Sequence, residues 1–375
     1  MPAPKPLRVL QILPALNAGG VERGTLDFAR TLVQLGHESF VVSNGGTMVA
    51  ELEAAGTTHL TRPVHRKSLI SYAQVRPMRR LLRELNPDIV HVRSRMPAWI
   101  TWLAWRKLPA SQRPGLVSTF HGLYSVTPYS AIMAKGERLI AISDCVHEYV
   151  LANYQVDPNK VTRIYRGLDP SRFQESAESA AEQALLLREF PQFKNQHLIL
   201  MPGRLSRWKG QLDFLKLMAQ LAPLEPQCHG VILGAAEADK AHYQQELLQL
   251  RDQLGLQDRV TLVGHRTDIQ AFYRLARVCC HLSSKPEPFG RTVPEALACG
   301  CPVVAYNRGG AAESLQQSFP AGLVEPGNLE QCANRIRQLL TEKPSVSLPA
   351  AFFLQHQVAA TLDVYQELLV AKACH

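Results

Sequence analysis

The segment His197-Leu-Ile-Leu-Met-Pro-Gly-Arg-Leu-Ser-Arg-Trp-Lys-Gly210 joins an apolar run to a basic loop that begins and ends with glycine. Residues 211–221 then continue with apolar side chains at helical spacing. A short apolar run, a Gly/Pro-containing loop and an amphipathic stretch together are typical of one strand–helix unit of an α/β protein. We therefore predict a buried strand at 197–201 and a helix at 211–221.

The same strand–helix pattern recurs along the whole chain. Further apolar runs that predict strands lie at residues 8–13, 38–43, 88–92, 116–120 and 139–142, and again at 230–233, 259–263, 278–282 and 302–305. Stretches with helical periodicity, such as 21–35 and 242–254, lie between them. This alternation predicts an α/β fold with doubly wound parallel sheets, in which helices cover both faces.

The length of the chain indicates two such domains. Its 375 residues exceed the roughly 250 to 300 residues at which a single hydrophobic core stops growing. An acidic, Ala/Ser-rich stretch at 174–183 shows no strand pattern, and a looser stretch with two prolines and two serines covers 341–350. We predict a first domain over residues 1–178 and a second over 179–351, followed by a helical tail.

The positive charge is concentrated in the first half. The formal net charge is +9, of which +8 falls within residues 1–180. Between Arg62 and Arg113 there are twelve Lys or Arg and two acids, together with Trp99, Trp102 and Trp105. The pattern fits a membrane or carbohydrate-stacking surface, and it equally fits a core-packed helix with a basic solvated face. An acidic partner is expected, such as an anionic membrane or a phosphorylated glycan; nucleic acid is unlikely, because no nucleic-acid-binding module accompanies the charge.

Targeting and redox features point to the cytoplasm. No apolar run reaches the ~18 residues that would span a bilayer. The first apolar run is interrupted by Gln11, which favours a strand over a weak signal peptide. The chain has no C-x-x-C pair, and four of its eight cysteines lie in apolar runs, which favours core thiols over zinc sites or disulfides.

Two glycine-containing loops are candidates for binding an anion. Neither the G-x-G-x-x-G fingerprint nor the P-loop occurs. Gly19 and Gly20 follow the first predicted strand and precede the helix at 21–35, where backbone N–H groups can approach an anion or simply form a turn. In the loop 203–210, Arg204 and Lys209 would suit a diphosphate, or they form a solvated cationic loop.

A carboxylate segment provides the sharpest chemical signal. Glu287-Pro-Phe-Gly-Arg-Thr-Val-Pro-Glu295 places two glutamates eight positions apart around a Pro/Gly-containing loop. Pro294 suits the first position of a short helix, so Glu295 lies where the helix dipole favours its charge. Glu287 has no comparable structural explanation. Two rigidly held carboxylates near a cationic loop are natural acceptors for sugar hydroxyls.

Six segments in order resemble the family 4 retaining glycosyltransferases of the GT-B fold. They are Gly19-Gly-Val-Glu-Arg23, Ile140-Ala-Ile-Ser-Asp144, Ile164-Tyr-Arg-Gly-Leu-Asp169, the loop 203–210, Glu287-x7-Glu295 and Gly309-Gly-Ala-Ala-Glu313. The resemblance covers nearly the whole chain. It implies two Rossmann-like domains facing across a cleft. The tail 352–369 resembles the helix that returns to the N-terminal domain in this fold, so residues 352–375 are expected to complete the first domain.

The resemblance implies roles for residues of the second domain, which would hold most of a nucleotide-sugar donor. Arg204 and Lys209 would neutralise the diphosphate. Glu295 would accept hydrogen bonds from the ribose, and Glu287 would hold the transferred sugar. The backbone of Phe289 and Gly290 would assist Glu287, and the base would pack near residues 263–266, which include His265.

The resemblance also implies roles for the first domain. Gly19 and Gly20 would approach the diphosphate, and His121 would reach the donor sugar. Relatives usually carry Asn-Gly where this chain has Arg166-Gly167, so the role of that Asn does not carry over to Arg166. The family retains anomeric configuration without an obvious protein nucleophile. No D-x-D pair occurs, in agreement with transfer that needs no metal and no cofactor.

The sequence therefore predicts a cytoplasmic, metal-independent retaining glycosyltransferase. It would move a sugar from a nucleotide-diphosphate sugar to a glycan or lipid-linked acceptor, in lipopolysaccharide core or other surface polysaccharide synthesis. It could attach peripherally to the anionic inner face of the membrane. The alternatives are a nucleotide-sugar hydrolase or epimerase, a non-catalytic nucleotide-sugar-binding protein and a membrane adaptor. The presence of both glutamates together with Arg204 and Lys209 disfavours an inactive homologue.

Overall fold

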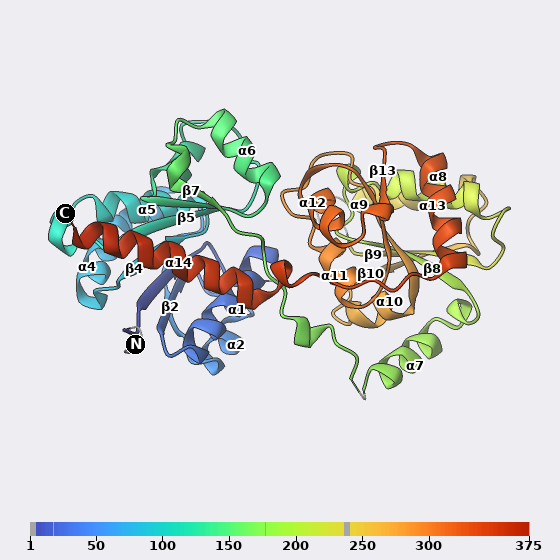
Figure 1. The fold of residues 1–375 in the computed structure, drawn as a ribbon, viewed down its shortest axis with the longest axis horizontal. Coiled ribbons are helices and arrows are strands. Elements are labelled where there is room, and N and C mark those ends of the chain that lie inside the picture. Colours follow the sequence, from blue (N-terminus) through green and yellow to red (C-terminus); the bar gives the residue numbers. More distant parts are fainter. Residues whose placement is uncertain (1–4, 18, 177, 236–240, 375) are drawn as a thin grey trace. The chain divides into compact units, whose positions relative to one another are not determined.

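The computed structural model describes residues 5–17, 19–176, 178–235 and 241–374 (Figure 1). It contains two compact units. The first comprises Met1–Asp169 together with Phe353–His375, and the second comprises Pro170–Phe352. The sequence placed the end of the first domain at 178. The stretch 174–183, which showed no strand pattern, contains the start of a helix, α7 (Ser179–Glu189).

The first unit is built on a seven-stranded parallel sheet. Its strands are β1 (Arg8–Ile12), β2 (Glu38–Ser43), β3 (Thr58–Thr61), β4 (Ile89–Val92), β5 (Gly115–Phe120), β6 (Arg138–Ala141) and β7 (Val161–Arg163). Their order in the sheet is β3-β2-β1-β4-β5-β6-β7. The chain moves outward from β1 to β3 and then crosses back to β4, so the loops after β1 and β4 lead away from each other.

Helices of the first unit come from both ends of the chain. They are α1 (Gly20–Gln34), α2 (Val49–Ala54), α3 (Leu69–Ala73), α4 (Val75–Leu85), α5 (Arg95–Trp105), α6 (Asp144–Asn153) and α14 (Leu354–Ala373). In Figure 1, α14 is the red helix that lies among the blue and green elements of this unit. Its apolar side chains, including Val358 and Leu368, share a core cluster with Phe28 of α1 and Val117 of β5.

Polar contacts fasten α14 to the sheet as well. His91 in β4 lies with its two ring nitrogens 2.6 Å from the hydroxyls of Tyr365 and Thr119. The backbone N–H of Gly167 donates to Gln357 Oε1 at 2.6 Å. The returning helix therefore completes both the apolar core and the buried polar network of the first unit.

The second unit contains a six-stranded parallel sheet in the order β10-β9-β8-β11-β12-β13. The strands are β8 (His197–Pro202), β9 (Cys228–Leu233), β10 (Val260–Gly264), β11 (Ala276–His281), β12 (Val303–Tyr306) and β13 (Leu323–Val324). Its further helices are α8 (Gln211–Leu221), α9 (Ala241–Gln253), α10 (Ile269–Leu275), α11 (Thr292–Ala298), α12 (Gly309–Ser318) and α13 (Leu329–Glu342). The crossover that reverses strand order lies here between β8 and β11.

The predicted doubly wound α/β fold is confirmed. Each of the ten predicted strands occurs within one or two residues of its expected ends. Three further strands were not predicted, namely β3, β7 and β13. All three lie at sheet edges and contain two to four residues, so they lack the fully buried apolar run that marks the central strands.

The three tryptophans of α5 are half-buried and engaged with their own unit. Trp99 donates its indole N–H to Tyr129 O at 2.9 Å, and Trp105 donates to Pro114 O at 2.8 Å. The rings of Trp99 and Trp102 meet edge to face. Helix α5 therefore packs against its own unit, in agreement with the core-packed alternative for these side chains.

Two other expectations concern cysteines and membrane spans. All eight cysteines are free thiols, and Cys228, Cys279, Cys280, Cys301 and Cys332 are buried, as expected for core thiols. Among the described residues, no helix combines the length and the apolar character that crossing a bilayer requires.

Deleting residues 353–375 is expected to unfold the first unit. Burying an apolar side chain stabilises a fold by about 1.5 to 3 kcal/mol, and α14 supplies several such side chains to the core. Their combined loss is comparable to the whole free energy of unfolding of a typical domain, about 5 to 15 kcal/mol. Circular dichroism and urea titration of the deletion variant would check this. A chain that lacks only Cys374 and His375 is the control. If the first unit still unfolded cooperatively at an unchanged urea midpoint after the long deletion, α14 would not be part of its core.

Candidate functional site

The loops that carry the predicted phosphate-binding and carboxylate residues lie next to each other in the second unit. The loop 203–210 follows β8, and residues 282–291 follow β11, its neighbour in the sheet. The carboxyl ends of parallel strands at such a crossover are where open α/β sheets bind ligands. Two segments almost eighty positions apart in the sequence are therefore brought together by the strand order alone.

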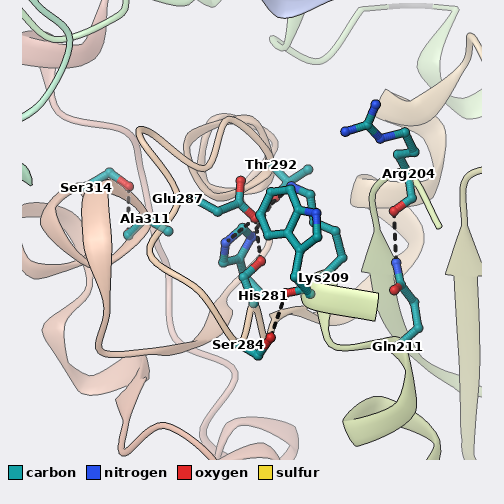
Figure 2. A network of polar contacts seen from close by, with 11 residues as sticks. Arg204, Lys209, Gln211, His281, Ser284, Glu287, Thr292, Ala311 and Ser314 are labelled. Carbon is teal, nitrogen blue, oxygen red and sulfur yellow. Dashed lines mark hydrogen bonds and ion pairs between the residues drawn. The ribbon is translucent and has the colours of Figure 1, made fainter. Parts of the chain in front are cut away.

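Lys209 and Glu287 form the centre of this site. Lys209 Nζ donates to Glu287 Oε1 at 2.6 Å, and both side chains are largely buried, with 17% and 8% of their surface exposed. The hydroxyl of Ser283 donates to the same carboxylate oxygen. His281 Nε2 lies 3.2 Å from it, an ion-pair contact that is not aligned as a hydrogen bond. Figure 2 shows Lys209 and His281 beside Glu287.

The surroundings keep Glu287 ionised. Burial by itself raises the pKa of the Glu287 carboxyl, but the neighbouring His281 and Lys209 outweigh burial and hold that pKa well below its ordinary value. Because His281 Nδ1 lies 3.0 Å from Thr292 Oγ1, its ring is held in place from the other side. The site therefore presents a fixed negative charge beside a fixed ammonium group.

Close backbone packing fixes the two loops relative to each other. The N–H of Ser284 donates to Trp208 O at 2.8 Å. Gly210 has φ +89°, and a Cβ atom at this position would collide with the carbonyl of Leu282. Only glycine accommodates both the left-handed conformation and this contact. The basic loop is thereby pressed against the carboxylate loop, which sets the position of Lys209.

The start of α12 supports the carboxylate loop from behind. Gly309 has φ +66°, and the N–H of Gly310 donates to Glu287 O at 2.8 Å. A Cβ atom on Gly309 would lie 2.7 Å from the same oxygen. The Gly309-Gly310 pair, which the sequence identified only through the resemblance, therefore holds the backbone of Glu287.

Glu295 lies in the first turn of α11, with 13% of its side chain exposed. Arg291 Nε donates to its Oε1 at 2.6 Å, and Tyr273 Oη donates to its Oε2 at 3.3 Å. The carboxylate is thus oriented by two donors and leaves lone pairs for further donors. The two glutamates have different partners, so they are separate features of one loop–helix segment.

The backbone between the glutamates offers hydrogen-bond donors. In the described part of the chain, the N–H groups of Phe289 and Gly290 donate to no acceptor. Phe289 buries its ring, which lies 6.4 Å from that of Phe352. Gly290 adopts φ +69°. Both N–H groups are therefore donors without a partner within the described residues.

Arg204 and His265 lie outside the Glu287 cluster. Arg204 shares the loop with Lys209, but its side chain is exposed, and its carbonyl accepts from Gln211 Nε2 at 3.1 Å (Figure 2). His265 is exposed after the edge strand β10. Beside it, Arg266 is engaged by Glu189 and Asp268. The structure brings together Lys209, Glu287, Phe289 and Gly290, with Glu295 one helical turn further on.

The predicted residues of the first unit lie at the carboxyl edge of its own sheet. Gly19 and Gly20 form the loop between β1 and α1, and His121 directly follows β5. Arg166 follows β7, and its guanidinium donates to the carbonyl of Gly20. These positions agree with the expectation that His121 stands at strand carboxyl ends.

Two functional residues were missed in the sequence. His281 lay within the predicted strand 278–282 and Ser283 directly after it, and neither was singled out, although both contact the Glu287 carboxylate. Polar side chains at the carboxyl end of a buried strand were the available signal. Among the described residues, no group of three or more His, Cys, Asp or Glu side chains is arranged to hold a metal ion.

Two family models match the chain in succession. The model described as Glycosyltransferase Family 4 matches residues 18–172, and the model described as Glycosyl transferases group 1 matches residues 184–351. The chain belongs to glycosyltransferase family 4. The two matches include every residue of both sites described above and leave out α14.

Relatives and solved structures agree with this family. The chain is 27% identical over 283 residues to a D-inositol 3-phosphate glycosyltransferase of Mycobacterium sp. strain JLS, covering 70% of this chain and 61% of that protein. The chain thus spans about three fifths of the length of the curated relatives it matches. A Rickettsia africae glycosyltransferase structure aligns with a TM-score of 0.84 and 29% identity, covering 97% and 99% of the two chains.

A third match concerns the fold. The structure of Anabaena Alr3699/HepE in complex with UDP and glucose aligns with a TM-score of 0.77 and 23% identity, covering 98% of this chain and 100% of that one. At this identity the likeness shows a common fold. The GT-B architecture expected from the sequence is thereby confirmed as the fold class.

Replacing Glu287 with Gln is expected to destabilise the second unit in a pH-dependent way. Breaking a buried ion pair costs about 3 kcal/mol. Because the folded-state pKa of Glu287 is lowered, its contribution is fully present above the ordinary glutamate pKa of about 4.3 and is lost as pH falls below it. Urea unfolding of the parent and of Glu287→Gln between pH 8 and 3.5 measures the difference in their free energies of unfolding. This difference should be constant down to about pH 5 and should then become smaller.

The control for this comparison is Glu246→Gln. Glu246 pairs with Arg207 in the same region, but that pair is exposed, so its loss should change the free energy of unfolding by less than about 1 kcal/mol at every pH. If Glu287→Gln changed the free energy of unfolding as little as this control, the buried pair would not stabilise the second unit.

Proposed function

We propose that the protein is a retaining, metal-independent glycosyltransferase that moves a sugar from a nucleotide-diphosphate sugar to a glycan or glycolipid acceptor. The observation that carries this proposal is the Lys209–Glu287 pair at the strand crossover of the second unit, flanked by two free backbone amides. A cation, an ionised carboxylate and rigid N–H donors at one place suit a ligand with both phosphate and hydroxyl groups. Family membership supports the same reaction class.

The cations would act on the leaving diphosphate. Negative charge grows on the diphosphate as the bond to the sugar breaks, and a positioned cation stabilises that charge more than the ground state. Lys209 is held by Glu287, so it needs little reorganisation to meet a phosphate. Arg204 is exposed at the start of the same loop and offers a planar fork of donors to a second phosphate oxygen.

Glu287 would hold the transferred sugar. Its carboxylate stays ionised, so it accepts hydrogen bonds from sugar hydroxyls and stabilises positive charge that develops near the reacting carbon. The N–H groups of Phe289 and Gly290 would donate to the sugar or phosphate oxygens. Retention without a protein nucleophile is proposed from the family resemblance, with the leaving group and acceptor meeting on the same face.

Glu295 would select the nucleoside. Arg291 and Tyr273 orient its carboxylate and donate to it, so a vicinal pair of ribose hydroxyls can occupy the remaining acceptor positions. We propose UDP as the first nucleotide to test, because HepE, which shares this fold, was solved with UDP and with UDP-glucose. The base would pack near residues 263–266 and His265.

A hydrolase would use the same donor contacts, so the geometry alone separates it poorly from a transferase. Donor consumption that depends on an added acceptor distinguishes the two reactions. A non-catalytic binding protein would need neither the ionised Glu287 nor its tight pairing with Lys209, whose burial is costly. We therefore favour a transferase acting in surface-glycan synthesis, of which the lipopolysaccharide core is one example.

The first unit offers a surface for an anionic membrane, which we propose as its cytoplasmic docking site. Leu69 and Ile70 of α3 are 88% and 68% exposed. Adjacent large apolar side chains with this much exposure often mark a surface that binds a partner or a membrane. Exposed cations lie on the adjoining segments, namely Arg66, Lys67, Arg76, Arg80 and Arg83. Apolar side chains that enter the membrane interface contribute to binding, and each nearby cation adds about 1 kcal/mol of binding free energy at an anionic surface. Together they bind a membrane reversibly. This surface takes the role that the sequence suggested for the α5 tryptophans.

Alanine at Glu295 should weaken UDP binding by about 10- to 100-fold, because hydrogen bonds to a charged group contribute about 1.5 to 3 kcal/mol. Alanine at Glu287 should leave UDP binding within a few-fold and reduce turnover at least 100-fold. Calorimetry and donor-consumption assays measure the two effects, and Glu330→Ala, an exposed glutamate of α13, is the control. Unchanged UDP affinity in Glu295→Ala would rule out the ribose contact.

The docking surface predicts stronger sedimentation with anionic than with neutral vesicles. The double substitution Leu69→Ser and Ile70→Ser should reduce binding to anionic vesicles at least tenfold. The matched control is Leu224→Ser, an exposed leucine of the second unit that is 54% exposed. Equal binding to both vesicle types would exclude the electrostatic part, and unchanged binding of the double variant would exclude α3.

A further inference from the structure

A second cluster of basic side chains lies in the first unit, at the carboxyl edge of its sheet. Arg93 directly follows β4, His121 directly follows β5, and Arg166 comes shortly after β7. These three side chains line one small pocket together with Thr119 of β5 and with Gln357 and Thr361 of α14. The pocket adjoins the crossover between β1 and β4, the position where a sheet of this topology binds ligands.

Arg93 is buried, with 3% of its surface exposed, and has no carboxylate partner within the described ranges. Its Nε donates to Gln11 Oε1 at 2.8 Å, and the guanidinium lies 5.4 Å from the centre of the Phe28 ring. Burial lowers the pKa of Arg93 to about 10, so it remains a cation at neutral pH. A buried guanidinium that is paired only with a neutral amide is costly for a folded protein.

His121 is the second unusual group. Neither of its ring nitrogens is accessible to solvent, and neither has a hydrogen-bond partner among the described residues. Burial, followed by the charges of Arg166 and Arg93, lowers its pKa well below the ordinary value. A neutral imidazole with both nitrogens unpartnered lacks hydrogen bonds that a ligand in this pocket would supply.

Arg166 adds a second positive charge beside the start of α1. Its guanidinium donates to the carbonyl of Gly20. Cβ atoms built on Gly20 and Gly24 would lie 3.3 Å and 3.1 Å from its terminal nitrogens, so these two glycines make room for it. The positive end of the α1 dipole, Arg166 and Arg93 thus favour the same charge. Gln357 of α14 binds the N–H of Gly167 and so positions Arg166.

We propose that this pocket binds an oxygen of a phosphoryl group, with Arg93 and Arg166 as its cationic partners and His121 as a further hydrogen-bond partner. Within the described part of the chain, none of the residues that line it is acidic. Its cavity volume of about 10 Å³ is roughly the room for one water-sized group, so a phosphate enters with one oxygen and keeps the others outside. The two guanidinium groups then both meet the negative charge of that oxygen.

The phosphoryl group has two possible sources, the diphosphate of the donor or a phosphorylated acceptor. This inference goes beyond the proposed transfer, because it assigns an anion site to Arg93 and Arg166, to which the family resemblance gives no role. Binding of inorganic phosphate can be measured without turnover. Its failure would therefore leave the transferase proposal standing, and a failure of transfer would leave the anion site testable.

The experiment is calorimetric titration of the full chain with inorganic phosphate, with and without saturating UDP. The variants are Arg93→Gln, Arg93→Lys and Arg166→Asn, which restores the residue that relatives usually carry. Arg8→Gln is the matched control, because Arg8 lies in the same sheet at its amino edge and pairs with Glu38. We expect Arg93→Gln and Arg166→Asn to bind phosphate at least tenfold more weakly than the parent. Arg93→Lys should fall between them and the parent, and Arg8→Gln should be unchanged.

The UDP arm identifies the source. Phosphate binding that persists with UDP bound indicates a phosphorylated acceptor. Competition by UDP, together with weaker UDP binding in both variants, indicates the donor diphosphate. Circular dichroism confirms that each variant is folded, and if Arg93→Gln does not fold, Arg166→Asn and Arg93→Lys decide the result. No phosphate binding, or equal binding in the folded variants and the parent, overturns the proposal and leaves a pocket that holds water only.

Discussion

The ion pair between Lys209 and Glu287 joins two loops that are far apart in the chain and adjacent only because β8 and β11 are neighbours in the sheet. Both charges are mostly removed from water, so each depends on the other and on Ser283 and His281. The glycines at 210 and 309 exist in these conformations because the loops must approach so closely. Burying the two charges costs free energy of folding, but it also keeps a cation and an anion fixed before any ligand binds. Such fixed charges are the condition for electrostatic stabilisation of a transition state.

The first unit depends on a different constraint, the return of the chain as α14. Tyr365 and Gln357 tie this helix to His91 and Gly167, and Gln357 thereby controls where Arg166 lies. A polar residue that interrupts an apolar strand also has a buried partner in this unit. Gln11, which looked out of place in the first apolar run, is the partner of Arg93. Each unit thus concentrates its buried charge at the carboxyl edge of its sheet, where the fold can use it for binding.

Much of this could be predicted from the sequence, because buried parallel strands are continuous apolar runs and loop glycines mark close approaches. The ten predicted strands, the fold class and the proximity of the basic loop to Glu287 follow from such patterns. The edge strands β3, β7 and β13 could not be predicted, since they are short and only partly buried. His281 and Ser283 were missed because their role depends on how the loop after β11 folds back to bring Glu287 onto them, which the spacing alone does not show. The Trp99, Trp102 and Trp105 stripe was ambiguous because the same spacing serves packing and surface binding, and only the partners of the indole N–H groups separate the two.

The central claim is that the second unit holds a nucleotide-sugar donor without a metal ion. Calorimetric titration of the full chain with UDP, GDP and ADP, each in the presence of a chelator, tests it most directly. The account predicts that one nucleotide binds clearly more tightly than the other two, and that Lys209→Met reduces its affinity at least tenfold, since Lys209 would meet the diphosphate. Absence of binding by all three nucleotides, or binding that Lys209→Met leaves unchanged, would contradict the claim.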